Sequence, residues 1–192
     1  MRSPVDPGPL RARRPRPETH PAGPAQGPGA PTLPIGWTVP SIPADTRKQM
    51  AAYLQQLTAR INEKGYAIPF IPADPRTGEP SLAYTVGLHV HRGYELAVSG
   101  LDYEMSRSAL NSLAVRLLEQ QTPPTPDMEV RGAVGGGYPL RLRQAGSALP
   151  FVLIRTVYRR NPPVWQAVWP DRKGRFPGDA ACTLSAGAQL PL

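Results

Sequence analysis

The stretch SLAYTVGLHVHRGYELAVSGL, residues 81–101, decides the fold. Its two halves, LAYTVGLHV at 82–90 and YELAVSG at 94–100, are rich in β-branched and aromatic residues, which favour strands. HRG at 91–93 is typical of a tight connection between two strands. The sequence therefore predicts two neighbouring strands in the middle of a sheet.

Two amphipathic helices are predicted on either side of this stretch. Asp45 or Thr46 can cap a helix that runs to about Lys64, in which apolar residues recur at helical spacing. A second helix follows Asp102 and ends before the prolines of TPPTPD at 122–127. Their apolar faces predict that both helices cover a sheet.

Shorter extended segments supply the other strands. YAIPFIP at 66–72 holds two prolines and belongs at a sheet edge, and strands are also expected within 127–134, 138–144 and 163–179. FVLIRTVYRR at 151–160 fits either a strand or a turn of buried helix. The order of elements predicts an α+β fold, a mainly antiparallel sheet with the two amphipathic helices packed on one face.

Composition divides the chain into three parts. Of the 26 prolines, 12 fall within residues 1–43, among several arginines and few large apolar side chains. Such a segment cannot bury enough apolar surface to offset its chain entropy. We expect a disordered Pro/Arg-rich leader at 1–40, a single α+β domain at 41–180 and a flexible C-terminal tail at 181–192.

The formal charge of +8 is unevenly distributed. Residues 35–130 hold 8 basic and 10 acidic groups, whereas residues 131–192 hold 9 basic and 2 acidic groups. A basic final third predicts one basic face that attracts an anionic partner. The expected anion contacts are Arg141, Arg143, Arg172 and Lys173.

Several classes of protein are disfavoured by the sequence. Cys182 is the only cysteine, so an internal disulfide is excluded, and no apolar stretch is long enough to span a membrane. An apolar secretion signal is missing as well, which predicts a cytoplasmic protein. No phosphate-binding loop, dinucleotide fingerprint or other familiar motif indicates a cofactor. The oligomeric state is not predicted.

His89 and His91 form an H-x-H pair. Side chains two residues apart on a strand share a face, so both imidazoles could reach one metal ion. A metal would need a further ligand, and exposed histidines beside a turn are common, so we predict no metal site. Asp171 is the carboxylate that could join either histidine in catalysis.

Asp171 lies in the loop of QAVWPDRKGRFPGD, residues 166–179. An acid among three basic residues usually closes its own turn. The alternative is an anion-binding rim, in which guanidinium groups lie beside the aromatic rings of Trp165, Trp169 and Phe176.

Two stretches resemble motifs of a bacterial family known as domain of unknown function 4262. They are LAYTVGLHVHRGYELAVSGL at 82–101 and QAVWPDRKGRFPGD at 166–179, and GYAIPFIPAD at 65–74 fits the family's opening strand. The resemblance covers about residues 60–180 and implies a shared fold without an established activity. It singles out these residues: Tyr84, Thr85, Gly87, Leu88, Glu95, Leu96, Gln166, Trp169, Asp171, Gly174, Arg175 and Phe176.

We expect a ligand-binding site where the two motifs meet, formed by Tyr84, Thr85, Gly87, Gln166, Trp169, Asp171, Arg175 and Phe176. The favoured function is a non-enzymatic binding or regulatory domain with affinity for an anionic partner, such as nucleic acid, a nucleotide or an acidic protein. The alternative is a hydrolase or phosphate-acting enzyme that uses His89 or His91 with Asp171.

Overall fold

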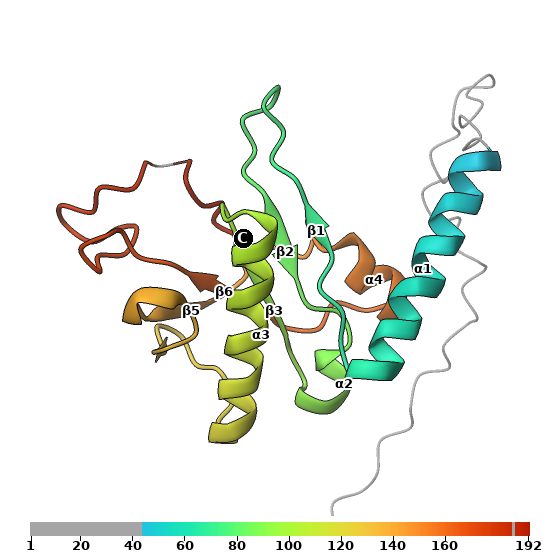
Figure 1. Cartoon of the computed structure of the whole chain (residues 1–192), viewed down its shortest axis with the longest axis horizontal. Coiled ribbons are helices and arrows are strands. Elements are labelled where there is room, and N and C mark those ends of the chain that lie inside the picture. The colour runs from blue at the N-terminus through green and yellow to red at the C-terminus, as the bar shows by residue number, and fades with distance from the viewer. Residues whose placement is uncertain (1–43, 186) are drawn as a thin grey trace, which may run out of the picture. The chain divides into compact units, whose positions relative to one another are not determined.

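The sheet is built outward from two central strands whose residues are all buried, β3 (Glu95–Ser99) and β6 (Val164–Val168). In the computed structural model, which describes residues 44–185 and 187–192, six strands pair in the order β1-β2-β3-β6-β5-β4 (Figure 1). The others are β1 (Phe70–Ile71), β2 (Leu82–Tyr84), β4 (Glu129–Val130) and β5 (Leu140–Gln144).

β3 and β6 are parallel, and the other neighbouring strands are antiparallel. The helices are α1 (Ala44–Lys64), α2 (Leu88–Arg92), α3 (Tyr103–Gln120) and α4 (Val152–Tyr158), with a short 3₁₀ turn at Gly135–Gly137. The predicted α+β class and mainly antiparallel sheet are confirmed.

Side chains alternate along the central strands between two apolar cores. In β3, Leu96 and Val98 belong to the first core, while Ala97 belongs to the second. The first core is closed by α3, whose fully buried residues include Leu110 and Leu113. Because both faces of the central strands are covered, their polar side chains, Glu95, Ser99 and Gln166, are buried as well.

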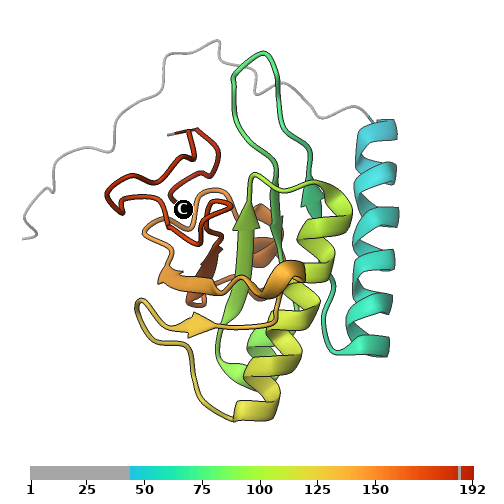
Figure 2. The same ribbon diagram turned by 60° about the vertical axis from the view of Figure 1, so that its left-hand side comes forward.

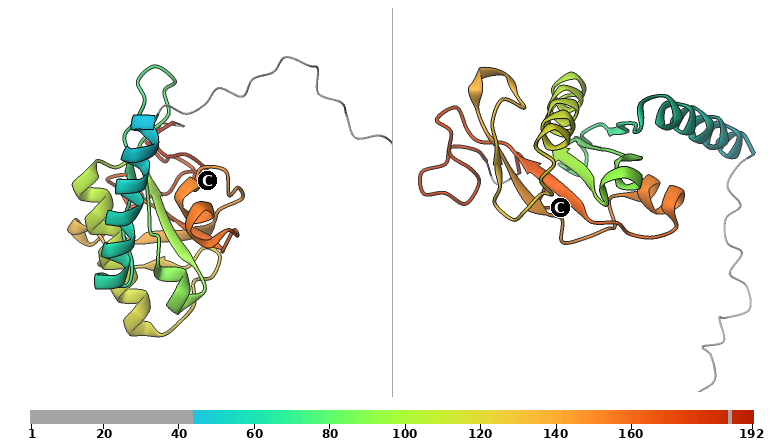
Figure 3. Two further views of the ribbon diagram at one scale, coloured as in Figure 1. Left: turned by 90° about the vertical axis from the view of Figure 1, so that its right-hand side faces the viewer. Right: turned by 90° about the horizontal axis from the view of Figure 1, so that it is seen from below.

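The second core is closed by α4 and by part of α1. Ile154 of α4 and Leu57 of α1 both pack in it. Figure 2 shows α3 over the sheet with α1 beside it, and Figure 3 shows α3 and α4 on opposite sides of the sheet. The two long helices therefore do not share one face as expected, since α1 contributes its buried residue to the second core.

α3 begins where the sequence predicts, because the side chain of Asp102 accepts a hydrogen bond from the Met105 amide at 2.8 Å. α1 ends at Lys64 as predicted, but Asp45 and Thr46, expected as its cap, lie within the helix. Its apolar stripe is only partly covered. Met50 and Tyr53 are exposed by 51% and 41%. The stripe therefore contacts the core only near the C-terminal half of the helix.

The predicted strand over 82–90 is wrong beyond Tyr84. The chain leaves the sheet at Gly87, whose φ of 121° suits glycine, and then forms the single helical turn α2. The ambiguous segment 151–160 contains a helix, α4. Helix and strand compete closely in such short apolar segments, and packing decides between them.

The expected leader at 1–40 lies outside the described residues. Within the part of the chain that is described, no helix has the length and apolar character needed to cross a membrane. Residues 187–192 of the expected flexible tail run beside the sheet, where the Leu192 carbonyl accepts a hydrogen bond from the Gly146 amide at 2.7 Å.

The first core gives a stability prediction. Leu113 is fully buried in α3, so Leu113→Ala removes apolar contacts and leaves a cavity. We expect the free energy of unfolding to fall by about 2–5 kcal/mol, measured by urea denaturation. Val115→Ala, at a position 48% exposed on the same helix, is the control and should change it by less than about 0.5 kcal/mol. Equal losses in the two variants would contradict the assignment of this face of α3 to the core.

Candidate functional site

The two motifs lie side by side along β3 and β6, but many of their candidate residues gather toward opposite ends of these strands. Thr85 pairs with Leu96 at the beginning of β3, where Glu95 lies beside Val164 at the beginning of β6. Trp169 follows the other end of β6, and its indole nitrogen donates to the Ser99 carbonyl at 2.9 Å. The length of β6 therefore separates Thr85 and Gly87 from the loop that contains Trp169, Asp171, Arg175 and Phe176. Tyr84 and Gln166 lie in the middle of the sheet, where both pair with Ala97 of β3.

Glu95 organises the end of the sheet that carries the first motif. Its side chain is fully buried and accepts four hydrogen bonds. Oε2 accepts from the Thr85 hydroxyl at 2.5 Å, and Oε1 accepts from the amides of Gly87 and His89 at 2.9 and 3.0 Å. Oε1 also accepts from the Tyr158 hydroxyl at 2.6 Å. A buried charge needs such partners, and these join β2, α2, β3 and α4.

Gly87 is fixed between this carboxylate and the end of α1. Besides Glu95, its amide contacts the Tyr158 hydroxyl at 2.6 Å. A Cβ atom at this position would lie 2.6 Å from the Gly65 carbonyl oxygen and 2.8 Å from Cα of Tyr66. The glycine is therefore required by the close approach of the Gly65 and Tyr66 backbone.

Tyr158 is a partner of Glu95 that the sequence did not reveal. Burial raises the pKa of its hydroxyl, and the hydrogen bond to Glu95 and the charge of that carboxylate raise it further. Tyr158 therefore stays protonated and donates. Its ring lies edge-on to the ring of His89, with 5.3 Å between centroids.

The histidine pair does not lie on a strand, as expected, because both residues belong to α2. Nε2 of His89 lies 2.9 Å from Arg160 Nη2, and since a guanidinium only donates, this nitrogen accepts. His91 is exposed. Over the described ranges, no three or more His, Cys, Asp or Glu side chains are grouped so as to hold a metal ion.

Asp171 holds its own loop together. Oδ1 accepts from the amides of Lys173 and Arg175, and Oδ2 accepts from the Arg175 guanidinium and from both the amide and the hydroxyl of Thr183. The hydrogen bonds from the Arg175 side chain hold the pKa of Asp171 well below its usual range. With both oxygens engaged, this carboxylate is a structural anchor.

Gln166 and Tyr84 also have structural partners. The Gln166 amide nitrogen donates to the Leu190 carbonyl at 2.5 Å, and its oxygen accepts from the Leu192 amide at 3.1 Å. Tyr84 is 1% exposed and packs edge-on against Phe151, with ring centroids 5.3 Å apart. Both side chains are therefore occupied by the protein itself.

The expected anion contacts are partly neutralised. Arg141 pairs with Glu129 and Asp179 and stacks over the ring of Phe176 at 3.9 Å. Arg143 lies 3.8 Å from Asp127. Arg172 and Lys173 are exposed. The basic final third of the chain therefore does not form one uncompensated cationic face at these four positions.

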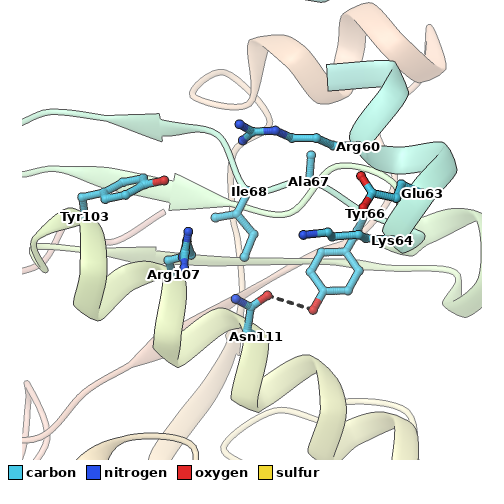
Figure 4. A pocket seen from close by; sticks show the side chains of 9 residues that line it. All are labelled: Arg60, Glu63, Lys64, Tyr66, Ala67, Ile68, Tyr103, Arg107 and Asn111. Carbon is cyan, nitrogen blue, oxygen red and sulfur yellow. Dashed lines mark hydrogen bonds between the residues drawn. The ribbon is translucent and has the colours of Figure 1, made fainter. Parts of the chain in front are cut away.

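A different group of cationic residues surrounds a cavity of about 350 Å³ between the end of α1 and the first half of α3. Figure 4 shows the charged ends of Arg60 and Lys64, from α1, and of Arg107, from α3, directed toward the space around Ile68. Glu63 is the one acidic residue that lines it. The lining therefore carries three positive charges and one negative charge.

Polar groups between the charges complete the pocket. The Tyr66 hydroxyl donates to Asn111 Oδ1 at 3.0 Å (Figure 4), and burial raises the pKa of this tyrosine. The hydrogen bond orients the Asn111 amide, whose nitrogen keeps its two donors. Tyr103 lies at the other end, with its ring 5.9 Å from the Arg107 guanidinium carbon and edge-on to Phe70.

None of these pocket residues was predicted as a site residue. A signal is present in the spacing, because Arg60 and Lys64 are four residues apart, as are Tyr103, Arg107 and Asn111 in succession. Residues with this spacing share one face of a helix. The pattern also fits an ordinary solvated face, and the sequence does not show that the two faces meet.

The hydrogen bonds of the Glu95 carboxylate predict the effect of a substitution on stability. In Glu95→Gln, an amide nitrogen replaces one oxygen and faces groups that themselves donate. We expect the free energy of unfolding to fall by about 2–4 kcal/mol in chemical denaturation. Glu104→Gln, at an exposed position, should change it by less than about 0.5 kcal/mol. A Glu95→Gln variant as stable as the parent would show that the four hydrogen bonds do not hold this end of the sheet.

Asp171 gives a prediction of pH dependence. Its pKa is lower in the folded chain than the value of about 3.9 expected when unfolded. Its contribution to stability is therefore present above about pH 4 and is lost as the pH falls below that value. We expect Asp171→Asn to be less stable than the parent at pH 7, with the difference in thermal midpoint shrinking toward pH 3. The exposed Asp127→Asn is the control, and a difference that grows on acidification would contradict the assignment.

Comparisons with known proteins assign the chain to a family without adding a function. No curated protein matches the sequence. A crystal structure described as a SUFU (suppressor of fused protein) homologue from Neisseria gonorrhoeae is similar at 13% identity and a TM-score of 0.38, over 67% of this chain and 79% of that chain. So low a score carries no argument. A family model described as a domain of unknown function (DUF4262) matches residues 60–183, more than half of the sequence, and the chain belongs to this family.

Proposed function

We propose that the domain is a binding module that holds a small anion in the pocket between α1 and α3. The observation that carries this proposal is the convergence of Arg60, Lys64 and Arg107, from two helices, on one cavity. The three side chains are exposed, and their like charges repel one another and attract anions from solvent. A bound anion relieves this repulsion.

The three pocket cations differ from Arg141 and Arg175 in their ion pairs. Among the residues that the structure describes, none of the ion pairs involves Arg60, Lys64 or Arg107. Arg141 and Arg175, by contrast, are each engaged by carboxylates. The three pocket cations are therefore more available to a ligand than Arg141 and Arg175.

The hydrogen-bonding groups of the pocket favour the same class of ligand. The two guanidinium groups, the Lys64 ammonium and the Asn111 amide together offer many donors, whereas the Glu63 carboxylate is the principal acceptor. A ligand rich in acceptors, such as a phosphate, sulfate or carboxylate, complements this set. The volume, about 350 Å³, lies within the range of small-molecule sites.

Another hollow, of about 560 Å³, is lined by the loops around β1 and has no cationic residue among the described residues of its lining. Its charged residues are Asp74, Glu79 and Asp102, all acidic. We do not propose the enzymatic alternative, in which Asp171 acts with a histidine. Asp171 is hydrogen-bonded within its own loop at one end of β6, while His89 lies beside Tyr158 at the other end. The pocket between α1 and α3 is therefore the better candidate.

A thermal-shift measurement at low ionic strength, with inorganic phosphate, sulfate and citrate as probes, tests the proposal. We expect at least one anion, at ten times its Kd, to stabilise the full chain by about 1.4 kcal/mol, or about 3–6 °C. Arg60→Gln/Arg107→Gln should lose this shift, because it removes two of the three cations.

The control is Arg47→Gln/Lys48→Gln, which removes the same charge from the exposed beginning of α1. This variant should keep the shift. If the two double variants responded alike, the effect would come from net charge rather than from the pocket, and the proposal would fail.

A further inference from the structure

We infer that the ligand of this pocket is a small phosphate monoester with a flat or apolar body next to the phosphate. The inference rests on the proposed function and names the class of anion. Its first support is charge, since three cationic and one acidic side chain give the lining a net charge of +2. A phosphate monoester carries a charge of about −1.5 to −2 at neutral pH, which matches this value more closely than a singly charged anion does.

Geometry supports the same class. Arg60 and Arg107 belong to different helices, so their planar guanidinium groups approach the space around Ile68 from different sides (Figure 4). A tetrahedral phosphate presents three terminal oxygens and can accept from more than one fork at once. A carboxylate has two oxygens in one plane, which match the geometry of one planar fork.

The body of the ligand is indicated by the apolar part of the lining. Ala67 and Ile68 contribute apolar surface, and Tyr103, which is 42% exposed, lines the pocket at one end. The Tyr103 ring is held by its edge-on contact with Phe70, so it presents a fixed surface on which a flat or apolar group can pack.

The size of the cavity favours a small molecule over a polymer. A volume of about 350 Å³ is near the lower end for small-molecule sites and accommodates a phosphate with a body about the size of one ring. The hollow around β1 carries acidic residues such as Asp74 and Glu79, and the hollow that shares Asn111 with the pocket carries both Arg116 and Glu119. A nucleic acid backbone would meet these negative charges.

Calorimetric titration of the full chain with phenyl phosphate and phenyl sulfate tests the inference. Both probes have the same ring and a tetrahedral oxyanion, but the sulfate keeps a single negative charge. We expect phenyl phosphate to bind about tenfold more tightly at pH 7.5. Its affinity should fall about fourfold at pH 5.5, where its second ionisation is mostly reversed, while that of phenyl sulfate stays constant.

Two variants connect the binding to the pocket. Arg107→Gln should lower the affinity for phenyl phosphate by about tenfold, which is the loss expected for one charge-assisted hydrogen bond. Glu63→Gln should raise this affinity, because it removes a negative charge that repels the phosphate. Inorganic phosphate should bind more weakly than phenyl phosphate, and Tyr103→Leu should reduce this difference.

The outcomes separate the inference from the proposed function. If phenyl sulfate bound as tightly as phenyl phosphate and both depended on Arg107, the phosphate inference would be overturned and anion binding would stand. If neither probe bound, and the other anions also failed to shift the thermal midpoint, both would be overturned. If phenyl phosphate binds more tightly than phenyl sulfate, and Arg107→Gln weakens that binding, both the inference and the proposed function are supported.

Discussion

The buried carboxylate of Glu95 is the constraint on which the arrangement of this domain depends. An ionised side chain inside a protein loses its hydration, and only fixed donors can replace it. Here the donors come from three separate segments: the Thr85 hydroxyl, the amides that open α2, and the Tyr158 hydroxyl. Each segment must be in place for the charge to be satisfied, so the carboxylate couples the end of β2 to α4, more than sixty residues later in the chain.

A second carboxylate has the corresponding role at the other end of β6. Asp171 gathers donors from its own loop and from Thr183, and so closes the connection that follows the central strand. The two motifs by which the chain resembles its family therefore contain much of the scaffold's buried polar chemistry. Their acids, glycine and glutamine are engaged with the protein itself, which leaves few groups in them for an outside ligand.

The sequence predicted what depends on local chemistry and on periodicity. The Asp102 cap, the end of α1 at Lys64, the bounds of α3 and the edge position of β1 follow from side chains that act on their own neighbourhood. It did not predict α2, because the choice between strand and helix after Tyr84 depends on Glu95, a residue outside the segment. Nor could spacing show that the faces bearing Lys64 and Arg107 would meet.

The scaffold and the candidate pocket are connected through Gly87. Its amide is held by Glu95, and its α-carbon is so close to Gly65 and Tyr66 that a methyl group would not fit. The bridge between Ala67 and Val86 fixes the same segment from the other side. These contacts set where α1 ends, and with it where Arg60 and Lys64 lie relative to α3. The pocket is therefore built from exposed helical side chains whose mutual position is determined by the buried carboxylate, and the signals for function and for fold fall on different residues.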